Sequence, residues 1–143
     1  MIAVDTNVIL RYLLDDDKQQ SHKAAKLFTR HERILILDVV LVELVWTLKG
    51  KKYQLNKEDI ILVITKLFEE PNVIFEDDKT VWRALKDYAK APSVKVGNKK
   101  KSADFPDALI INKAQYYTTP ENSVVTVYTF DQTAQCISGA NEP

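Results

Sequence analysis

The 143-residue sequence predicts an α/β fold, in which a short, mainly parallel central sheet lies between two layers of helices as a three-layer α/β/α sandwich. Short apolar segments alternate along the chain with longer helical ones, and this alternation favours a parallel sheet covered on both faces. The chain is long enough for one domain with a real core, so we expect residues 1–143 to form a single domain.

The apolar pattern predicts each element in order. Four short segments rich in branched apolar residues are expected to be strands: residues 2–4, 34–37, 72–75 and 123–130. Segments with helical spacing of apolar residues are expected to be helices: residues 6–14, 15–32, 39–50, 56–70, 77–91, 104–117 and 131–137. Asp38 and Asn56 are expected to cap the helices that follow them. The lysine-rich segment "VKVGNKKKSA" (94–103) is expected to be a basic loop.

Charge and cysteine content exclude several classes of protein. Twenty basic residues balance twenty acidic ones, so a polyanionic partner has to be bound by a local patch. A single cysteine, Cys136, excludes an internal disulfide framework and fits a reducing compartment. The most apolar segment, residues 34–48, is too short to cross a membrane and contains two acids. We therefore expect a cytoplasmic protein that does not associate with membranes.

Two aspartates lie three residues apart at the start of the helix "DFPDALI" (104–110). Asp104 and Asp107 can cap this helix, because carboxylate oxygens accept hydrogen bonds from the N–H groups of the first turn, where Pro106 is also tolerated. Residues three apart also share one face of a helix, so the same pair can bind a metal ion. The two roles are compatible, because the positive end of a helix favours a carboxylate.

Three further acids occupy places where a site is expected. Asp5 and Asp131 each follow a predicted strand, and in parallel sheets ligands collect beyond the carboxyl ends of the strands. Glu43 lies within an apolar helix. Its carboxylate is either buried, at a cost that a partner or a metal has to offset, or it lies on a narrow solvent face.

Carboxylates that converge without a basic partner repel one another unless a hard cation neutralises them. Oxygen-only ligands are those that Mg²⁺ and Mn²⁺ prefer, and such ions, alone or in pairs, activate water for displacement at a phosphodiester. No group of histidines or cysteines competes, since His22 and His31 lie in and after a polar helix and are expected to be solvated. The candidate metal ligands are Asp5, Glu43, Asp104, Asp107 and Asp131.

Four motifs occur in the order and spacing of the PIN-domain family: "VDTNVILRYLL", "LVELVWTL", "ADFPDALI" and "YTFD". The chain resembles most the VapC-type toxins of toxin–antitoxin pairs, over about residues 2–135. The resemblance implies an α/β/α sandwich, ribonuclease activity that depends on Mg²⁺ or Mn²⁺, a homodimer, and inhibition by a cognate antitoxin. It assigns the catalytic role to Asp5, Glu43, Asp107 and Asp131, while Asp104 corresponds to an extra acid of many members.

Other residues are expected to support the site. Thr6, Asn7 and Thr129 adjoin the acids in the sequence and are expected to orient carboxylates or water, while capping or strand formation also explains them. The lysines of the basic loop are expected to hold the RNA backbone, with a solvated loop as the alternative. These lysines are Lys95, Lys99, Lys100 and Lys101.

Two other classes of function compete with a nuclease. A non-catalytic module that keeps the fold and binds RNA or protein would be expected to lose acids, whereas this chain retains all four. A haloacid-dehalogenase-type phosphatase requires a second aspartate two residues after the first, where this chain has Asn7. The chain also departs from many PIN domains at Thr118, Thr119, Pro120 and Glu121, where members often have a turn with glycine.

Overall fold

The computed structural model describes residues 1–30, 32–117, 121 and 123–143. The predicted exit of the second helix at His31 and the turn at Thr118, Thr119 and Pro120 lie outside the described residues. The chain divides into two compact units, Met1–Asp78 and Lys79–Pro143. Within the described ranges, no helix is both long and apolar enough to cross a membrane.

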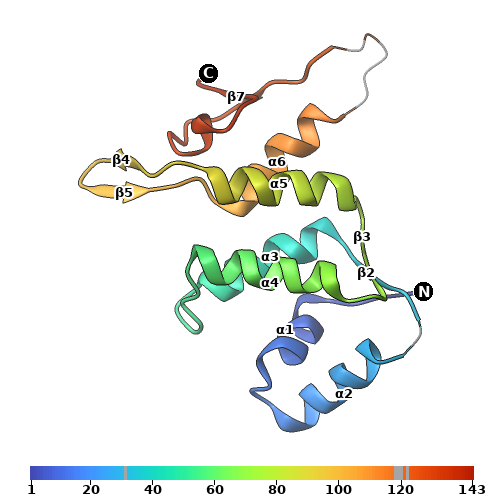
Figure 1. Ribbon diagram of the computed structural model, residues 1–143. Helices are drawn as coiled ribbons and strands as arrows, with labels where there is room; N and C mark the ends of the chain where they lie inside the picture. The colour runs from blue at the N-terminus through green and yellow to red at the C-terminus, as the bar shows by residue number, and fades with distance from the viewer. Residues whose placement is uncertain (31, 118–120, 122) are drawn as a thin grey trace. The chain divides into compact units, whose positions relative to one another are not determined.

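The first unit contains a parallel sheet of three strands in the order β1–β2–β3 (Figure 1). Its register places Ile34 opposite Ile2 on one side and Val73 on the other. The strands are β1 (Ile2–Ala3), β2 (Ile34–Ile36) and β3 (Val73–Phe75), and the helices that connect them are α1 (Thr6–Leu14), α2 (Lys18–Phe28), α3 (Asp38–Lys49) and α4 (Lys57–Glu69). The predicted parallel α/β arrangement is therefore confirmed, with helices in both crossovers.

Apolar side chains from strands and helices form the core of this unit. The large fully buried residues come from α1, from β2 and from the inward faces of α3 and α4: Ile9, Ile34, Ile36, Leu41, Leu44, Leu48, Ile60, Ile64 and Leu67. Tyr12 of α1 stacks on Phe28 of α2 with ring centroids 3.8 Å apart, and its hydroxyl donates to Glu70 at 2.6 Å. These contacts hold α1 and α2 against each other and join α1 to the end of α4.

The helix boundaries in this unit depend on a few polar groups. Asn56 caps α4 as predicted, in a reciprocal capping box with Asp59. The prediction that Asp38 caps the third helix is wrong, because Asp38 is its first residue and Leu37 occupies the capping position without a side-chain bond. The carboxylate of Glu76 instead accepts from the N–H of Asp38 at 2.9 Å, so a residue distant in sequence supplies an acceptor at the helix start.

The second unit is built around two helices and a pair of short parallel strands. Its elements are α5 (Asp78–Lys90), α6 (Phe105–Gln115), β6 (Val127–Tyr128), the 3₁₀ helix η1 (Ala134–Cys136) and β7 (Ala140–Asn141). Tyr88 of α5 packs edge-on against Phe105 of α6, with ring centroids 6.0 Å apart. The strand predicted over 123–130 is shorter in the structure, where only Val127–Tyr128 form a strand. Strand β7 was not predicted, because a strand of two residues is too short to give an apolar pattern in the sequence.

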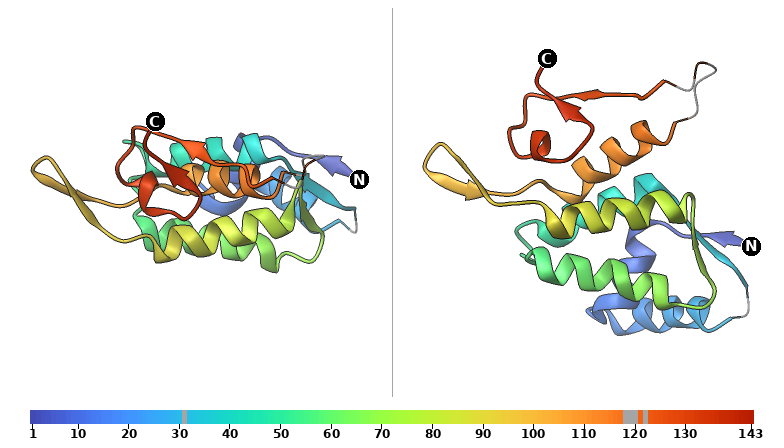
Figure 2. Two further views of the ribbon diagram at one scale, coloured as in Figure 1. Left: turned by 90° about the horizontal axis from the view of Figure 1, so that it is seen from above. Right: turned by 45° about the horizontal axis from the view of Figure 1, so that its top comes forward.

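The segment expected to be a basic loop is a β-hairpin in the structure. Strands β4 (Val94–Val96) and β5 (Lys99–Lys101) pair antiparallel and project beyond α5 and α6 (Figure 2). The two-residue turn between them begins with Gly97, whose φ of 63° is a conformation that glycine adopts without strain. The loop prediction failed because three consecutive lysines form β5, and lysine has a low preference for strands.

Candidate functional site

Asp5 lies where strand β1 leads into helix α1. Its carboxylate Oδ1 accepts a hydrogen bond from the N–H of Val8 at 3.0 Å, so Asp5 caps the helix. The side chain is exposed. Asp5 thus occupies the position predicted from sequence, beyond the carboxyl end of a parallel strand and at the positive end of a helix.

A hydrogen bond joins the next residue, Thr6, to Glu43 on α3. The Thr6 hydroxyl Oγ1 donates to Glu43 Oε2 at 2.9 Å. Thr6 is buried, with 5% of its surface exposed, whereas Glu43 is exposed beside Val39 and Trp46 of the same helix, which are 68% and 62% exposed. Of the two alternatives for Glu43, the structure supports the solvent face. This hydrogen bond restricts the Glu43 carboxylate, and the supporting role of Thr6 in a site stays a prediction.

Asp104 and Asp107 form a capping box at the start of α6. Asp104 Oδ1 accepts from the N–H of Phe105 at 2.8 Å, and Asp107 Oδ2 accepts from the N–H of Asp104 at 3.2 Å. Both side chains are half-buried. The capping role is therefore confirmed, and it fixes the two carboxylates on the first turn of the helix.

Asp131 is anchored by a threonine that the sequence analysis did not identify. Its Oδ1 accepts from the hydroxyl of Thr133 at 2.6 Å, from the N–H of Thr133 at 2.8 Å and from the N–H of Ala134 at 3.4 Å. The hydroxyl of Thr129 accepts from the N–H of Asp131 at 3.0 Å. The order Asp-x-Thr is typical of side chains that bond to the backbone two residues on, and it was the available signal.

The surroundings of Asp131 favour its charged form. The Thr133 hydroxyl lowers the pKa of the Asp131 carboxyl most; burial opposes this effect. The N–H groups of Thr133 and Ala134 and the positive charge of Lys101 lower the pKa further. Lys101 is the last residue of β5.

Two of the predicted residues, Asp107 and Thr129, line a common pocket in the second unit. The pocket has a volume of about 160 Å³. Its remaining lining is mostly apolar: Ile110, Ile111, Val127, Tyr128 and Ala134. Ala134 also donates its N–H to Asp131, so this part of the unit brings Asp107, Thr129 and the anchor of Asp131 together.

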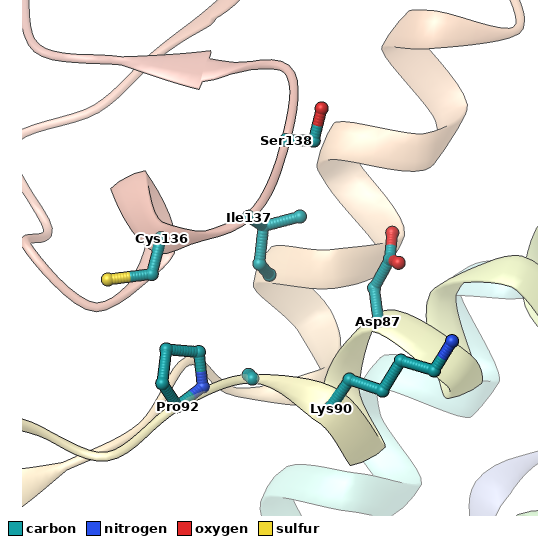
Figure 3. Close-up of a pocket in the computed structure, with 7 residues that line it drawn as sticks. Asp87, Lys90, Pro92, Cys136, Ile137 and Ser138 are labelled. Carbon is teal, nitrogen blue, oxygen red and sulfur yellow. The ribbon is translucent and has the colours of Figure 1, made fainter.

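A second, smaller pocket of about 110 Å³ contains none of the predicted residues. Figure 3 shows Asp87 and Lys90 of α5 on one side, and Cys136, Ile137 and Ser138 on the other. Asp87 Oδ2 accepts from the amide of the buried Asn112 at 2.8 Å, which links α5 to α6. We interpret the carboxylate of Asp87 as structural, because it satisfies this buried amide.

The candidate metal ligands are divided between the two units. Asp5 and Glu43 belong to the first unit, and Asp104, Asp107 and Asp131 to the second. In the part of the chain that the structure describes, no group of three or more histidine, cysteine, aspartate and glutamate side chains is placed to hold a metal ion. All five ligands are carboxylates, and this chemistry fits a hard divalent cation such as Mg²⁺ or Mn²⁺.

The other predicted residues are accessible. Asn7 is exposed on the first turn of α1. The lysines predicted to contact RNA are all exposed on the hairpin: Lys95 on β4, and Lys99, Lys100 and Lys101 on β5.

In a comparison with known families, the family model described as PIN domain matches residues 2–135. A comparison with curated proteins finds no match. PIN domains are generally metal-dependent nucleases, and the parallel sheet and helices described above are consistent with an α/β PIN-like fold.

We predict that Thr6 and Glu43 stabilise the fold together. In a double-mutant cycle with Thr6→Val and Glu43→Ala, the coupling free energy between the two residues should be about 0.5–1.5 kcal/mol. The reason is that Thr6→Val removes the donor of the hydrogen bond and Glu43→Ala removes its acceptor. The free energy of unfolding of the parent and the three variants, measured in denaturant with EDTA, gives this value. If the effects of the two substitutions on the free energy of unfolding simply add, the hydrogen bond does not hold Glu43.

Proposed function

The chain belongs to the PIN domain family, and from this premise we propose that it is a Mg²⁺- or Mn²⁺-dependent endoribonuclease that hydrolyses RNA phosphodiester bonds. The observation that carries the proposal is the family match over residues 2–135, in a chain that has an acid at each of the four motif positions. We further propose that residues 1–143 act as one nuclease domain. The acids are Asp5, Glu43, Asp107 and Asp131.

We propose that these four carboxylates are the metal ligands and that Asp104 is an additional one. When bound, a hard dication would activate a water molecule and neutralise charge on the phosphate during in-line displacement. The residues of the chain orient the carboxylates: Thr6 holds Glu43, and Thr133 holds Asp131. Restricting carboxylate rotation in this way favours metal affinity, because the ligands lose less freedom on binding.

The cellular role that we propose is that of the toxin of a type II toxin–antitoxin system in the cytoplasm, with a cognate antitoxin as its protein partner. This part of the proposal is supported by the four motifs in VapC-like order. A non-catalytic PIN module that binds RNA or protein is the alternative. The retained acids favour the enzyme, since carboxylates would weaken the binding of RNA phosphates unless a cation neutralises them.

We expect the protein to form a homodimer. The segment "IILVITKLF" (60–68) of α4 has more apolar residues than its inward face uses: Ile60, Ile64 and Leu67 are buried, whereas Leu62 is 53% exposed. Light scattering at tens of micromolar should give twice the mass of the chain. A monomeric mass would contradict the dimer and leave the nuclease proposal intact.

Mg²⁺ or Mn²⁺ should raise the melting temperature of the protein. A cation that binds only the folded state stabilises it by mass action and relieves repulsion among the acids. The measurement is thermal unfolding across a millimolar titration of each ion, with KCl at matched ionic strength as the control for screening. A melting temperature that follows ionic strength alone, whichever salt is added, would count against a metal site.

Asp107→Asn should abolish cleavage and leave the metal-free protein at least as stable as the parent. The change is nearly isosteric, and the amide oxygen can still accept from the N–H of Asp104. It removes one negative charge from a set of acids, and it lowers affinity for a hard dication. If Asp107 served only as a cap, asparagine would cost about 0.3–1 kcal/mol and leave cleavage unchanged.

Asp59→Asn is the matched control for this prediction. Asp59 occupies the equivalent position of the capping box of α4, and its Oδ2 accepts from the N–H of Asn56 at 3.2 Å, the same distance as in α6. Unfolding in EDTA and RNA cleavage with Mn²⁺ should be measured for both variants. Equal behaviour of the two variants, with cleavage retained, would show that capping accounts for Asp107.

A further inference from the structure

The β4–β5 hairpin carries four exposed lysines on two short strands. The register places Lys95 directly opposite Lys100, and Lys99 and Lys101 opposite Val96 and Val94. Because side chains alternate along a strand, Lys95 and Lys100 share one face of the hairpin, and Lys99 and Lys101 share the other. Both faces of the hairpin therefore present two ammonium groups.

The pairing of Lys95 with Lys100 is unfavourable in the protein alone. Directly opposed residues on antiparallel strands have Cβ atoms about 4.5–5.5 Å apart, and like charges at this distance destabilise the pair. The hairpin forms a sheet of its own with two strands, and such a ribbon is marginally stable in water. An anion that binds between the two ammonium groups would remove the repulsion and stabilise the hairpin.

The rest of the hairpin offers these lysines no compensating charge. The sequence contains no aspartate or glutamate between Asp87 and Asp104. Among the described residues, no ion pair within 4.0 Å includes any of the four hairpin lysines. A chain with no net charge thus concentrates positive charge on one projecting element.

The chemistry of the hairpin favours a phosphate backbone as the occupant. All four cations are lysines, which bind phosphates as point charges, and no arginine fork is present to read a base edge. The hairpin also contains no aromatic side chain on which a base could stack. Contacts of this kind position a nucleic acid without specifying its sequence.

We propose that the β4–β5 hairpin is a sequence-independent arm that binds the phosphate backbone of the substrate RNA, with Lys95 and Lys100 as its principal pair. The proposal rests on the ribonuclease function proposed above and specifies how that enzyme holds its substrate.

The test is the salt dependence of RNA binding, measured by fluorescence anisotropy with a labelled single-stranded RNA of mixed sequence in EDTA. The plot of log Kobs against log[KCl] has a negative slope, and each phosphate contact increases the magnitude of this slope by about 0.7 for single strands. The variant Lys95→Gln/Lys100→Gln should therefore reduce the slope by about 0.7–1.4 and weaken binding equally for unrelated sequences. In cleavage assays it should raise KM and leave kcat unchanged.

The matched control is Lys23→Gln/Lys51→Gln, which also removes two exposed lysines but leaves the hairpin intact. Equal slopes for the two variants would overturn the proposal. Binding of polyglutamate should be measured as a second probe. A hairpin variant that binds RNA as the parent does but no longer binds polyglutamate would also overturn the proposal, because the partner would then be an acidic peptide. Binding in EDTA requires no cleavage, so a protein that binds RNA through the hairpin but never cuts it would contradict only the nuclease function.

Discussion

Each proposed catalytic acid is fixed in place by a neutral hydrogen-bond donor, and the proposed chemistry depends on this constraint. The donors are the N–H of Val8 for Asp5, the hydroxyl of Thr6 for Glu43, the N–H of Asp104 for Asp107, and the hydroxyl and N–H of Thr133 for Asp131. A neutral donor orients a carboxylate without cancelling its charge, so the charge is retained for a hard cation. Helix starts supply such donors wherever a strand leads into a helix.

Most of the first unit could be predicted from sequence, because its elements follow from local patterns. Helix α1 has the predicted bounds, and Asn56 caps α4 as expected. Asp38 was predicted to cap α3 but is its first residue, and the acceptor for the N–H of Asp38 comes from Glu76, 38 residues away. A sequence window cannot show such a distant partner.

The second unit was harder to predict, because its short elements depend on pairing between segments. Strand β7 has two residues and pairs with β6, which lies more than ten positions earlier in the chain. The hairpin was missed because lysines mask its strand pattern, although Val94 and Val96 alternate and Gly97 marks the turn. Four candidate acids lie at helix starts or after strands as predicted, and Glu43 lies within α3 as predicted, whereas Thr133 was missed.

The most direct test of the central claim is incubation of the purified protein with total RNA in Mg²⁺, in Mn²⁺ and in EDTA, with the products resolved by size. The account predicts discrete internal fragments with either metal ion, none in EDTA, and recovery when an excess of metal ion is added back. RNA that stays intact under all conditions, or cleavage that persists in EDTA, would contradict a metal-dependent endoribonuclease.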